Sequence, residues 1–161
     1  MIRPAVSSDA AAIASLYNYY VENTAVTFEE EPLTADTIHS RLTEVQTHNL
    51  PWIVAEYEGE LIGYAYATPY HKRSAYRHSV ETTIYLKHDF HGRGFGKLLY
   101  DVLLKALKEK GFHAAIGVLG LPNEKSAALH EKLGFEKVGH LKAVGFKFNQ
   151  WRDVGYWQMM L

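Results

Sequence analysis

A lone carboxylate and a glycine-rich turn are the parts of this chain whose residue types and spacing most clearly indicate a chemical role. Glu81 lies in residues 79–87, a run with the composition typical of a β-strand. Residues 91–96 follow as a turn with three glycines, and an apolar helical run begins directly after them. The first turn of a helix has unpaired backbone N–H groups at the positive end of its dipole, where a phosphate can bind. The pattern therefore predicts a nucleotide-tailed cofactor beside a proton acceptor.

The glycines of this turn have a physical purpose in such a site. Without a Cβ, Gly92, Gly94 and Gly96 let the backbone turn sharply and approach a pyrophosphate closely, while Arg93 and Lys97 add positive charge. A plain strand-to-helix turn is the first alternative, because this glycine spacing is common. A dinucleotide-binding turn is the second, but the match falls mid-chain without the repeated strand–helix units of such a sheet.

The strand also indicates which side chains share a face with Glu81. Side chains alternate along a β-strand, so Glu81, Thr83 and Tyr85 lie on one face and the residues between them on the other. A carboxylate in a central strand is costly to bury unless it is paired or functional. Glu81 is therefore expected either to accept a proton in catalysis or to form an ion pair with Arg73 or Arg77.

The bulk composition excludes several classes of function. The 161 residues carry a net charge of −1, so no strong field favours nucleic acid or acidic membranes. The absence of cysteine excludes disulfides, thiol nucleophiles and thiolate metal sites. The nine histidines do not recur with carboxylates at ligand spacing, so no metal is expected. With no signal peptide and no apolar run of about eighteen residues, a soluble cytoplasmic protein is expected.

The pattern of elements indicates one α+β domain, residues 1–161, because no linker, repeat or low-complexity tract interrupts the chain. The predicted strands are 1–6, 52–57, 60–68, 79–87, 113–119, 135–146 and 152–160. The first predicted helix ends near Val21, and the others span about 34–47, 95–109 and 124–132. Hairpin and helix-crossover connections both occur, so the sheet is expected to be mixed. Helix 95–109 is expected to bury Leu98, Leu99, Val102, Leu103, Ala106 and Leu107.

Several short blocks, in this order, resemble the GCN5-related N-acetyltransferase (GNAT) family. The glycine turn resembles the family's pyrophosphate loop, Gln/Arg-x-x-Gly-x-Gly/Ala, except that His91 stands where Gln or Arg is usual. Other blocks resemble the phosphinothricin N-acetyltransferase branch, and the similarity covers essentially the whole chain. These blocks are residues 52–56, 75–85, 120–123, 143–147 and 151–158.

The resemblance implies a GNAT fold, with a central sheet of about seven strands flanked by about four helices. It implies acetyl-CoA as the acetyl donor, no metal, and direct transfer through a ternary complex to the α-amino group of a small amino acid similar to phosphinothricin or methionine sulfoximine. It also implies a homodimer. Two alternatives stay open: acetylation of a protein N-terminus or lysine, and a non-enzymatic acyl-CoA-binding regulatory domain.

The resemblance also assigns roles to residues. Glu81 matches the family's base, and His130 stands where the wider family often has the tyrosine that protonates the leaving thiolate; a packing role for His130 is the alternative. An N-cap role for Asn123 would be compatible with binding the cofactor. The residues expected to bind the cofactor are Ile84, Tyr85, Leu86, His91, Gly92, Arg93, Gly94, Phe95, Gly96, Lys97, Asn123 and Ser126. The residues expected to contact the acceptor are Phe28, Glu29, Arg73, Ser74, Ala75 and Tyr76.

Overall fold

Seven β-strands form one mixed sheet in the computed structural model, which describes all of residues 1–161. Across the sheet the order is β1-β2-β3-β4-β5-β7-β6, and every neighbouring pair is antiparallel except β4 and β5. The predicted mixed sheet of seven strands is confirmed. The strands are β1 (Ile2–Pro4), β2 (Trp52–Tyr57), β3 (Glu60–Pro69), β4 (Ser79–Leu86), β5 (Ala114–Leu121), β6 (Glu136–Lys147) and β7 (Gln150–Met160).

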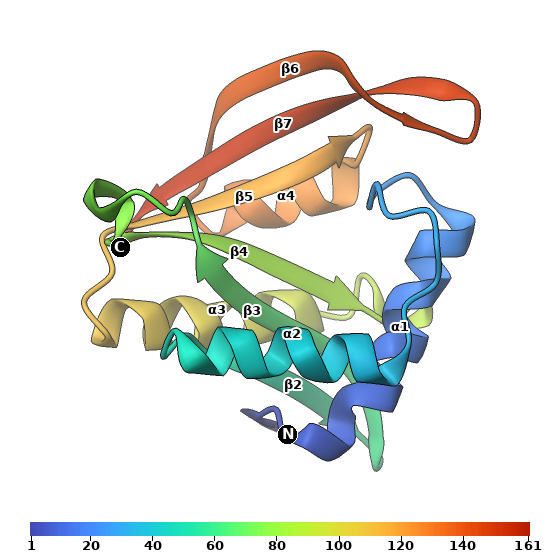
Figure 1. The fold of residues 1–161 in the computed structure, drawn as a ribbon, viewed down its shortest axis with the longest axis vertical. Helices are drawn as coiled ribbons and strands as arrows, with labels where there is room; N and C mark the ends of the chain where they lie inside the picture. The colour runs from blue at the N-terminus through green and yellow to red at the C-terminus, as the bar shows by residue number, and fades with distance from the viewer.

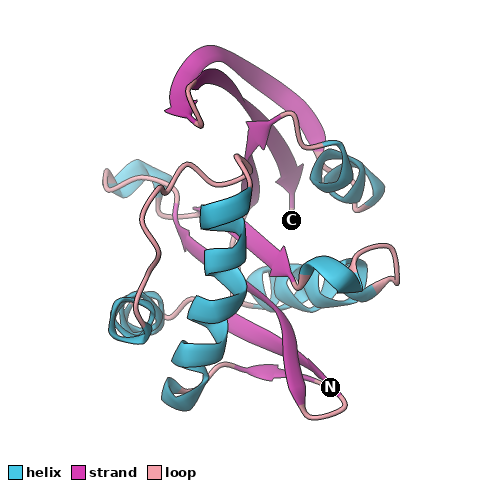
Figure 2. Ribbon diagram, turned by 90° about the vertical axis from the view of Figure 1, so that its right-hand side faces the viewer, coloured by secondary structure: helices cyan, strands magenta, loops and turns pink.

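Four α-helices cover the two faces of the sheet. Helices α1 (Ala10–Asn23) and α2 (Ala35–Thr47) lie on one face, and α3 (Phe95–Glu109) and α4 (Glu124–Lys132) lie on the other (Figures 1 and 2). None of them has the length and apolar character that crossing a membrane requires. Three short 3₁₀ turns complete the elements: η1 (Ser7–Asp9), η2 (Ser74–Tyr76) and η3 (His88–Phe90).

Local sequence signals explain where these elements end. The hydroxyl of Thr34 accepts a hydrogen bond from the backbone N–H of Thr37 at 3.1 Å, so it caps α2, which begins near its predicted start. Gly111 follows α3 with a φ of +86°, a conformation that glycine adopts at little cost. Strand β5 runs two residues beyond its predicted end, because it stays paired with β7 as far as Leu121 and Asp153.

The buried stripe of α3 differs from the predicted one. Leu99, Leu103 and Leu107 are fully buried against the sheet, whereas Leu98 is 58% exposed and Val102 is 40% exposed. Residues four apart form one stripe of a helix, and the stripe that contains Leu98 and Val102 lies outside the arc that faces the sheet. The predicted burial is therefore wrong for one stripe: Leu98, Val102 and, in part, Ala106.

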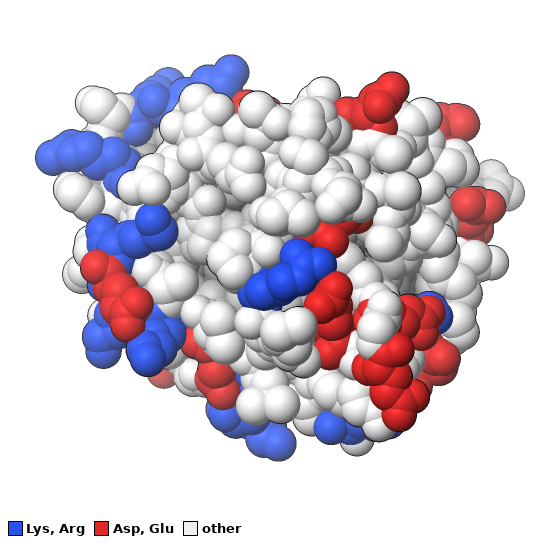
Figure 3. Space-filling view, turned by 90° about the horizontal axis from the view of Figure 1, so that it is seen from below, with Lys and Arg blue, Asp and Glu red and all other residues white.

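The charged side chains do not give the molecule one dominant sign on the face drawn in Figure 3. There, lysines and arginines gather toward one end and carboxylates toward the other, with the two signs mixed between them. This distribution agrees with the net charge of −1.

Truncation of α3 side chains is expected to separate the buried stripe from the exposed one. Leu103→Ala should lower the free energy of unfolding by about 2–5 kcal/mol, because it opens a cavity in the core. Leu98→Ala, one turn earlier on the exposed stripe, should change it by less than about 0.5 kcal/mol. Urea denaturation followed by circular dichroism measures both, and equal effects would contradict the observed orientation of α3.

Candidate functional site: the opening between β4 and β5

The two parallel strands at the centre of the sheet pair over only four residues. Residues 79–82 of β4 pair with 114–117 of β5, and beyond Thr82 the strands diverge (Figure 1). Strand β3 stays paired along all of β4, and β7 along all of β5. The sheet therefore opens at its centre, while both strands that border the opening remain fixed from their outer sides.

The hydrogen-bond pattern shows which backbone groups of β4 face this opening. The N–H of Lys87 donates to the C=O of Ile62 at 2.7 Å, and hydrogen-bonded pairs recur at every second residue of an antiparallel ladder. Tyr85 therefore turns its own N–H and C=O toward β3, whereas Ile84 and Leu86 turn theirs toward the opening. Of the three predicted backbone contacts to the cofactor, the register supports these two and excludes the backbone of Tyr85.

Side chains on both sides of the opening enclose a cavity of about 260 Å³, called here the Glu81 cavity. Its lining comes from α1, the loop after α1, strands β3, β4, β5 and β7, and α4 with its N-cap residue. It brings together seven of the residues singled out from the sequence: Phe28, Glu81, Ile84, Tyr85, Asn123, Ser126 and His130. Residues that lie far apart in the chain thus meet at one place.

Glu81 is a half-buried carboxylate without an ion pair. None of the salt bridges in the structure includes it, and Arg77 instead donates to the backbone oxygen of Ser74 at 3.1 Å. The alternative of an ion pair with Arg73 or Arg77 is therefore wrong. Burial raises the pKa of Glu81, and the nearby His71 acts in the opposite direction. An unpaired carboxylate with a raised pKa is suited to accept a proton near neutral pH.

His130 is held by hydrogen bonds at both ring nitrogens. Nδ1 lies 2.7 Å from the backbone oxygen of Ser126 and so carries the proton. Nε2, 3.0 Å from the hydroxyl of Tyr100, is left to accept. The ring is only 3% exposed, and burial lowers the pKa of His130, which keeps the imidazole neutral. It also lies against Gly117, where a Cβ would be 2.6 Å from Nε2. This geometry favours the packing role over the predicted acid.

The glycine turn has the geometry expected of an anion-binding turn. Gly92 and Gly94 have φ values of +74° and +85°, which other residues adopt only with strain, and α3 begins at Phe95. The guanidinium of Arg93 lies over the ring of Phe90, 4.7 Å from its centroid, and over two further aromatic rings. Lys97 pairs with Asp101 on the same helix at 2.6 Å. Both predicted cations therefore have partners within the protein.

Gly96 has a packing role instead, because its φ is not in the left-handed region. A Cβ at this position would lie 3.2 Å from the side chain of Leu86 and 3.3 Å from that of Leu129. The missing side chain lets the first turn of α3 lie close to β4 and α4.

His91 connects the turn to α1. Its Nε2 lies 2.9 Å from the hydroxyl of Tyr20, which also donates to the C=O of Leu86. Burial lowers the pKa of His91, with a smaller effect of Lys125 in the same direction. The carbonyl of Leu86 is thus already occupied by a phenol, so its N–H and both backbone groups of Ile84 are left for a ligand.

Asn123 is the N-cap of α4. Its side-chain oxygen accepts from the backbone N–H of Ser126 at 3.3 Å. Both residues also line the Glu81 cavity, so the capping role is compatible with the predicted contact to a cofactor.

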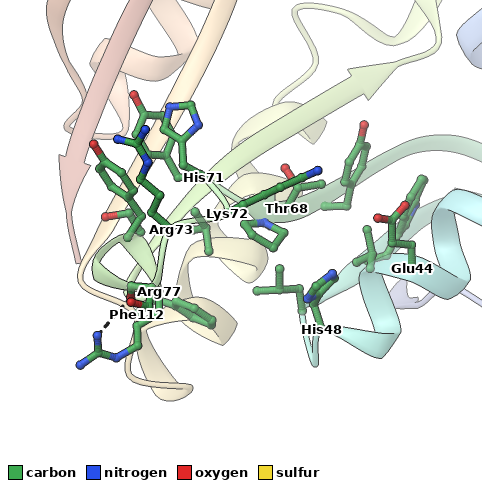
Figure 4. Close-up of a pocket in the computed structure, with 18 of the residues that line it drawn as sticks. Glu44, His48, Thr68, His71, Lys72, Arg73, Arg77 and Phe112 are labelled. Carbon is green, nitrogen blue, oxygen red and sulfur yellow. Dashed lines mark hydrogen bonds between the residues drawn. The ribbon is translucent and has the colours of Figure 1, made fainter.

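The predicted acceptor residues divide between two cavities. Arg73, Ser74 and Tyr76 line a second cavity of about 1220 Å³, called here the loop cavity, which lies between α2 and residues 70–77. Tyr66 lines both cavities. In Figure 4 the loop side carries His71, Lys72 and Arg73, and α2 carries Glu44 and His48 opposite them. This cavity is therefore wide and mostly cationic on its loop side.

Two predicted acceptor residues line neither cavity. Ala75 is absent from both linings. Glu29 is absent as well, because its carboxylate is bound by Arg41 of α2 and by the hydroxyl of Tyr17. The structure thus gives Glu29 a structural partner rather than a place facing an acceptor.

Tyr66 is the one side chain common to the two cavities, and it was not predicted from the sequence. Its ring stacks on Trp52 with centroids 4.0 Å apart. Alternation along residues 60–68 groups Tyr66 with Tyr64 and Thr68, but alternation does not say which face of a sheet carries a site. The register of β3 against β4 supplies this information: Tyr66 pairs with Thr83, which lies on the same face of β4 as Glu81.

The chain is similar over almost its whole length to known proteins. Residues 2–155 match a family model described as an acetyltransferase (GNAT) domain. A phosphinothricin N-acetyltransferase of Streptomyces viridochromogenes is 43% identical, covering 98% of this chain and 85% of the relative. An L-methionine sulfoximine/L-methionine sulfone acetyltransferase of Pseudomonas aeruginosa is 30% identical, covering 99% and 94%.

Two solved structures extend the likeness to three dimensions. A phosphinothricin acetyltransferase from Sinorhizobium meliloti in complex with AcCoA has a TM-score of 0.97 at 38% identity, covering 100% of this chain and 88% of that one. A ribosomal-protein-alanine N-acetyltransferase from Brucella melitensis also has a TM-score of 0.97, at 35% identity, covering 100% and 99%.

Replacing the carboxylate is expected to show how Glu81 affects stability. Since burial raises the pKa of Glu81, its contribution to stability is present in acid and is lost as pH rises through that raised pKa. Glu81→Gln should therefore have a Tm equal to or above that of the parent at pH 7–8 and lose any advantage toward about pH 4. Calorimetry across this range measures it, with Glu22→Gln on the exposed side of α1 as the control. A loss of stability confined to neutral pH would indicate an ion pair instead.

Proposed function

We propose, from the premise that the chain belongs to the GNAT family of acetyltransferases, that it transfers the acetyl group of acetyl-CoA to the α-amino group of a small amino acid. Phosphinothricin, methionine sulfoximine and methionine sulfone are the acceptor class, because relatives that cover this chain almost completely are named for them. The observation that carries the proposal is Glu81, a half-buried carboxylate without an ion pair, beside the unpaired backbone of β4.

The residues around the opening fit the donor. The N–H groups of Gly92 to Gly96 stand at the positive end of α3, where the pyrophosphate of acetyl-CoA would bind. The free backbone groups of Ile84 and Leu86 would pair with the amides of the pantetheine arm, as an added strand does. Acetyl-CoA supplies the acetyl group when it is bound.

The chemical steps belong to residues of the Glu81 cavity. A primary amine is mostly protonated at neutral pH, so Glu81 takes up its proton, directly or through a water molecule. The freed nitrogen forms the new C–N bond as the C–S bond breaks. The nitrogen then loses its second proton, and the departing thiolate takes up one proton, directly or through a water molecule. The N–H of Ile84 or Leu86 donates to the carbonyl oxygen as negative charge develops on it. His130 keeps Tyr100 and α4 in place.

The loop cavity would receive the rest of the acceptor. Its cationic side, with Arg73, suits the anionic or polar head of such amino acids, since a guanidinium can bind an oxyanion with two hydrogen bonds. Tyr66 lies between this cavity and Glu81, so an acceptor can reach both at once.

A second candidate is acetylation of a protein N-terminus. Two observations favour it: the loop cavity, at about 1220 Å³, is larger than a small amino acid needs, and the likeness to a ribosomal-protein-alanine N-acetyltransferase is close. The rings of Phe28 and Tyr66 in the much smaller Glu81 cavity support the small acceptor instead.

We further propose that the protein acts as a homodimer in the cytoplasm and that residues 1–161 form a single domain. The outer hairpin β6–β7 supports the dimer, because it exposes large apolar side chains that a second copy would cover. The most exposed of them are Val138, Val144, Phe146, Phe148, Trp151 and Met160, at 50–68%.

The first experiment is release of thiol from acetyl-CoA by the purified protein. Phosphinothricin, methionine sulfoximine, methionine sulfone, the free amino acids and N-terminal peptides serve as acceptors. Saturable turnover with small acceptors and none with peptides is the expected result. Turnover with peptides alone would establish the second candidate in its place.

Glu81→Gln is expected to separate catalysis from binding of the donor. The loss of the base should lower kcat by roughly 10²–10⁴-fold, while the Kd for acetyl-CoA, measured by calorimetry, stays within about threefold because the β4 backbone and the turn are intact. Glu22→Gln, on the exposed side of α1 and outside both cavities, is the control. Unchanged turnover in Glu81→Gln would rule out Glu81 as the base.

The pH profile offers an independent measure of the base. Burial raises the pKa of Glu81, and only the ionised form accepts a proton, so kcat/KM should fall as pH drops through that raised pKa. Glu81→Gln should lose this acidic limb and keep the limb set by the amine of the acceptor. The same acidic limb in both proteins would assign it to another group.

A further inference from the structure

Phe28 is wedged between two strands at positions where each carries a glycine. A Cβ on Gly145 of β6 would lie 2.4 Å from the ring of Phe28, and a Cβ on Gly120 of β5 would lie 3.0 Å from it. Real Cβ atoms essentially never come within 3.0 Å of another heavy atom, so Gly145 cannot gain a side chain while the ring stays in place. At Gly120 a Cβ would be crowded by the ring and would also lie 2.9 Å from the backbone oxygen of Ala25. The ring also lines the Glu81 cavity, so its position sets one boundary of that cavity.

The backbone on both sides of Phe28 is bound by one buried cation. Lys147, at the end of β6, is 2% exposed. Its Nζ donates to the C=O of Thr27 at 2.9 Å and to the C=O of Glu29 at 2.8 Å. No carboxylate lies within ion-pair distance of it, so these carbonyls are the groups that compensate for burying the charge. Burial lowers the pKa of Lys147.

The same loop is bound from its other side by α2 and α1. Arg41 donates to the carboxylate of Glu29 at 3.1 Å through Nη1, and the hydroxyl of Tyr17 donates to it as well. The backbone at Phe28 is thus fastened to β6, and the next side chain to the helices. These contacts fix the backbone on both sides of Phe28, so the ring can leave the glycines only by turning about its own side-chain torsions.

We propose that Lys147 is a positioning residue that holds Phe28 in its seat between Gly120 and Gly145, and that this seat sets the largest acceptor the enzyme can acetylate. The inference rests on the proposed function, since it specifies the acceptor of that same site. A ring displaced toward the cavity excludes larger acceptors, and a loosened loop binds every acceptor less firmly.

The test of the seat compares two acceptors that differ by one methylene, methionine sulfone and ethionine sulfone. Gly145→Ala forces the ring toward the Glu81 cavity and should lower kcat/KM for ethionine sulfone roughly 10-fold more than for methionine sulfone. Combining it with Phe28→Leu, which shortens the side chain, should restore the ratio. Gly139→Ala is the matched control on β6, because a Cβ there meets only ordinary contacts at 3.7 Å. An unchanged ratio in Gly145→Ala overturns the proposal.

The test of Lys147 as a positioning residue uses Lys147→Met. Lys142→Met, at an exposed lysine of the same strand, is its control. Lys147→Met should raise KM for both acceptors roughly 10-fold, with the Kd for acetyl-CoA unchanged, and Lys147→Gln, which keeps one donor, should lie between it and the parent. A fall in kcat with KM unchanged contradicts a positioning role.

A measurement of stability, which needs no turnover, tests the seat of Phe28 independently of the proposed function. In a double-mutant cycle of unfolding free energies, Gly145→Ala should destabilise the parent and lose most of that effect in the Phe28→Leu background. No turnover in the parent, with this coupling present, would overturn the acceptor assignment alone. Absence of coupling would overturn the seat itself.

Discussion

The separation of β4 from β5 after Thr82 is the constraint on which the rest of the site depends. Paired strands satisfy each other's backbone groups, and these two stop doing so halfway along their length. Each is kept straight by its outer neighbour, β3 or β7, so the opening does not collapse. The unpaired backbone of β4, the cavity beside Glu81 and the ring of Phe28 that lines this cavity all lie along this one gap in the ladder.

The sequence predicted the order of the elements and most of their ends, because the signals are local. Asn123 caps α4 as expected, Thr34 caps α2, and Gly111 follows α3, each a residue type that local propensity favours at that position. The exposed stripe of Leu98 and Val102 was missed because periodicity indicates that a helix has an apolar face, but the width of the buried arc depends on the sheet it contacts. The apolar character of Leu98 and Val102 therefore did not show that they lie outside this buried arc.

The site was predictable where one residue acts through its own backbone or charge, as at Gly92, Gly94 and Glu81. It was not predictable where a role depends on a partner distant in the chain. The hydrogen bonds of His130 with Tyr100 and Ser126 decide its protonation, and the ion pair with Arg41 removes Glu29 from the acceptor side. The strand register likewise turns the backbone groups of Tyr85 toward β3 and away from the opening, and residue identity cannot reveal this.

The two carbonyls bound by Lys147 have a consequence for how such a protein can change over generations. Every residue type supplies a backbone carbonyl, so Lys147 grips the loop without regard to which side chains it carries. Mutations in the loop can therefore alter the surface offered to the acceptor while the fastening persists and the gap between β4 and β5 is untouched. Mutation can therefore change the choice of acceptor without changing the use of the donor.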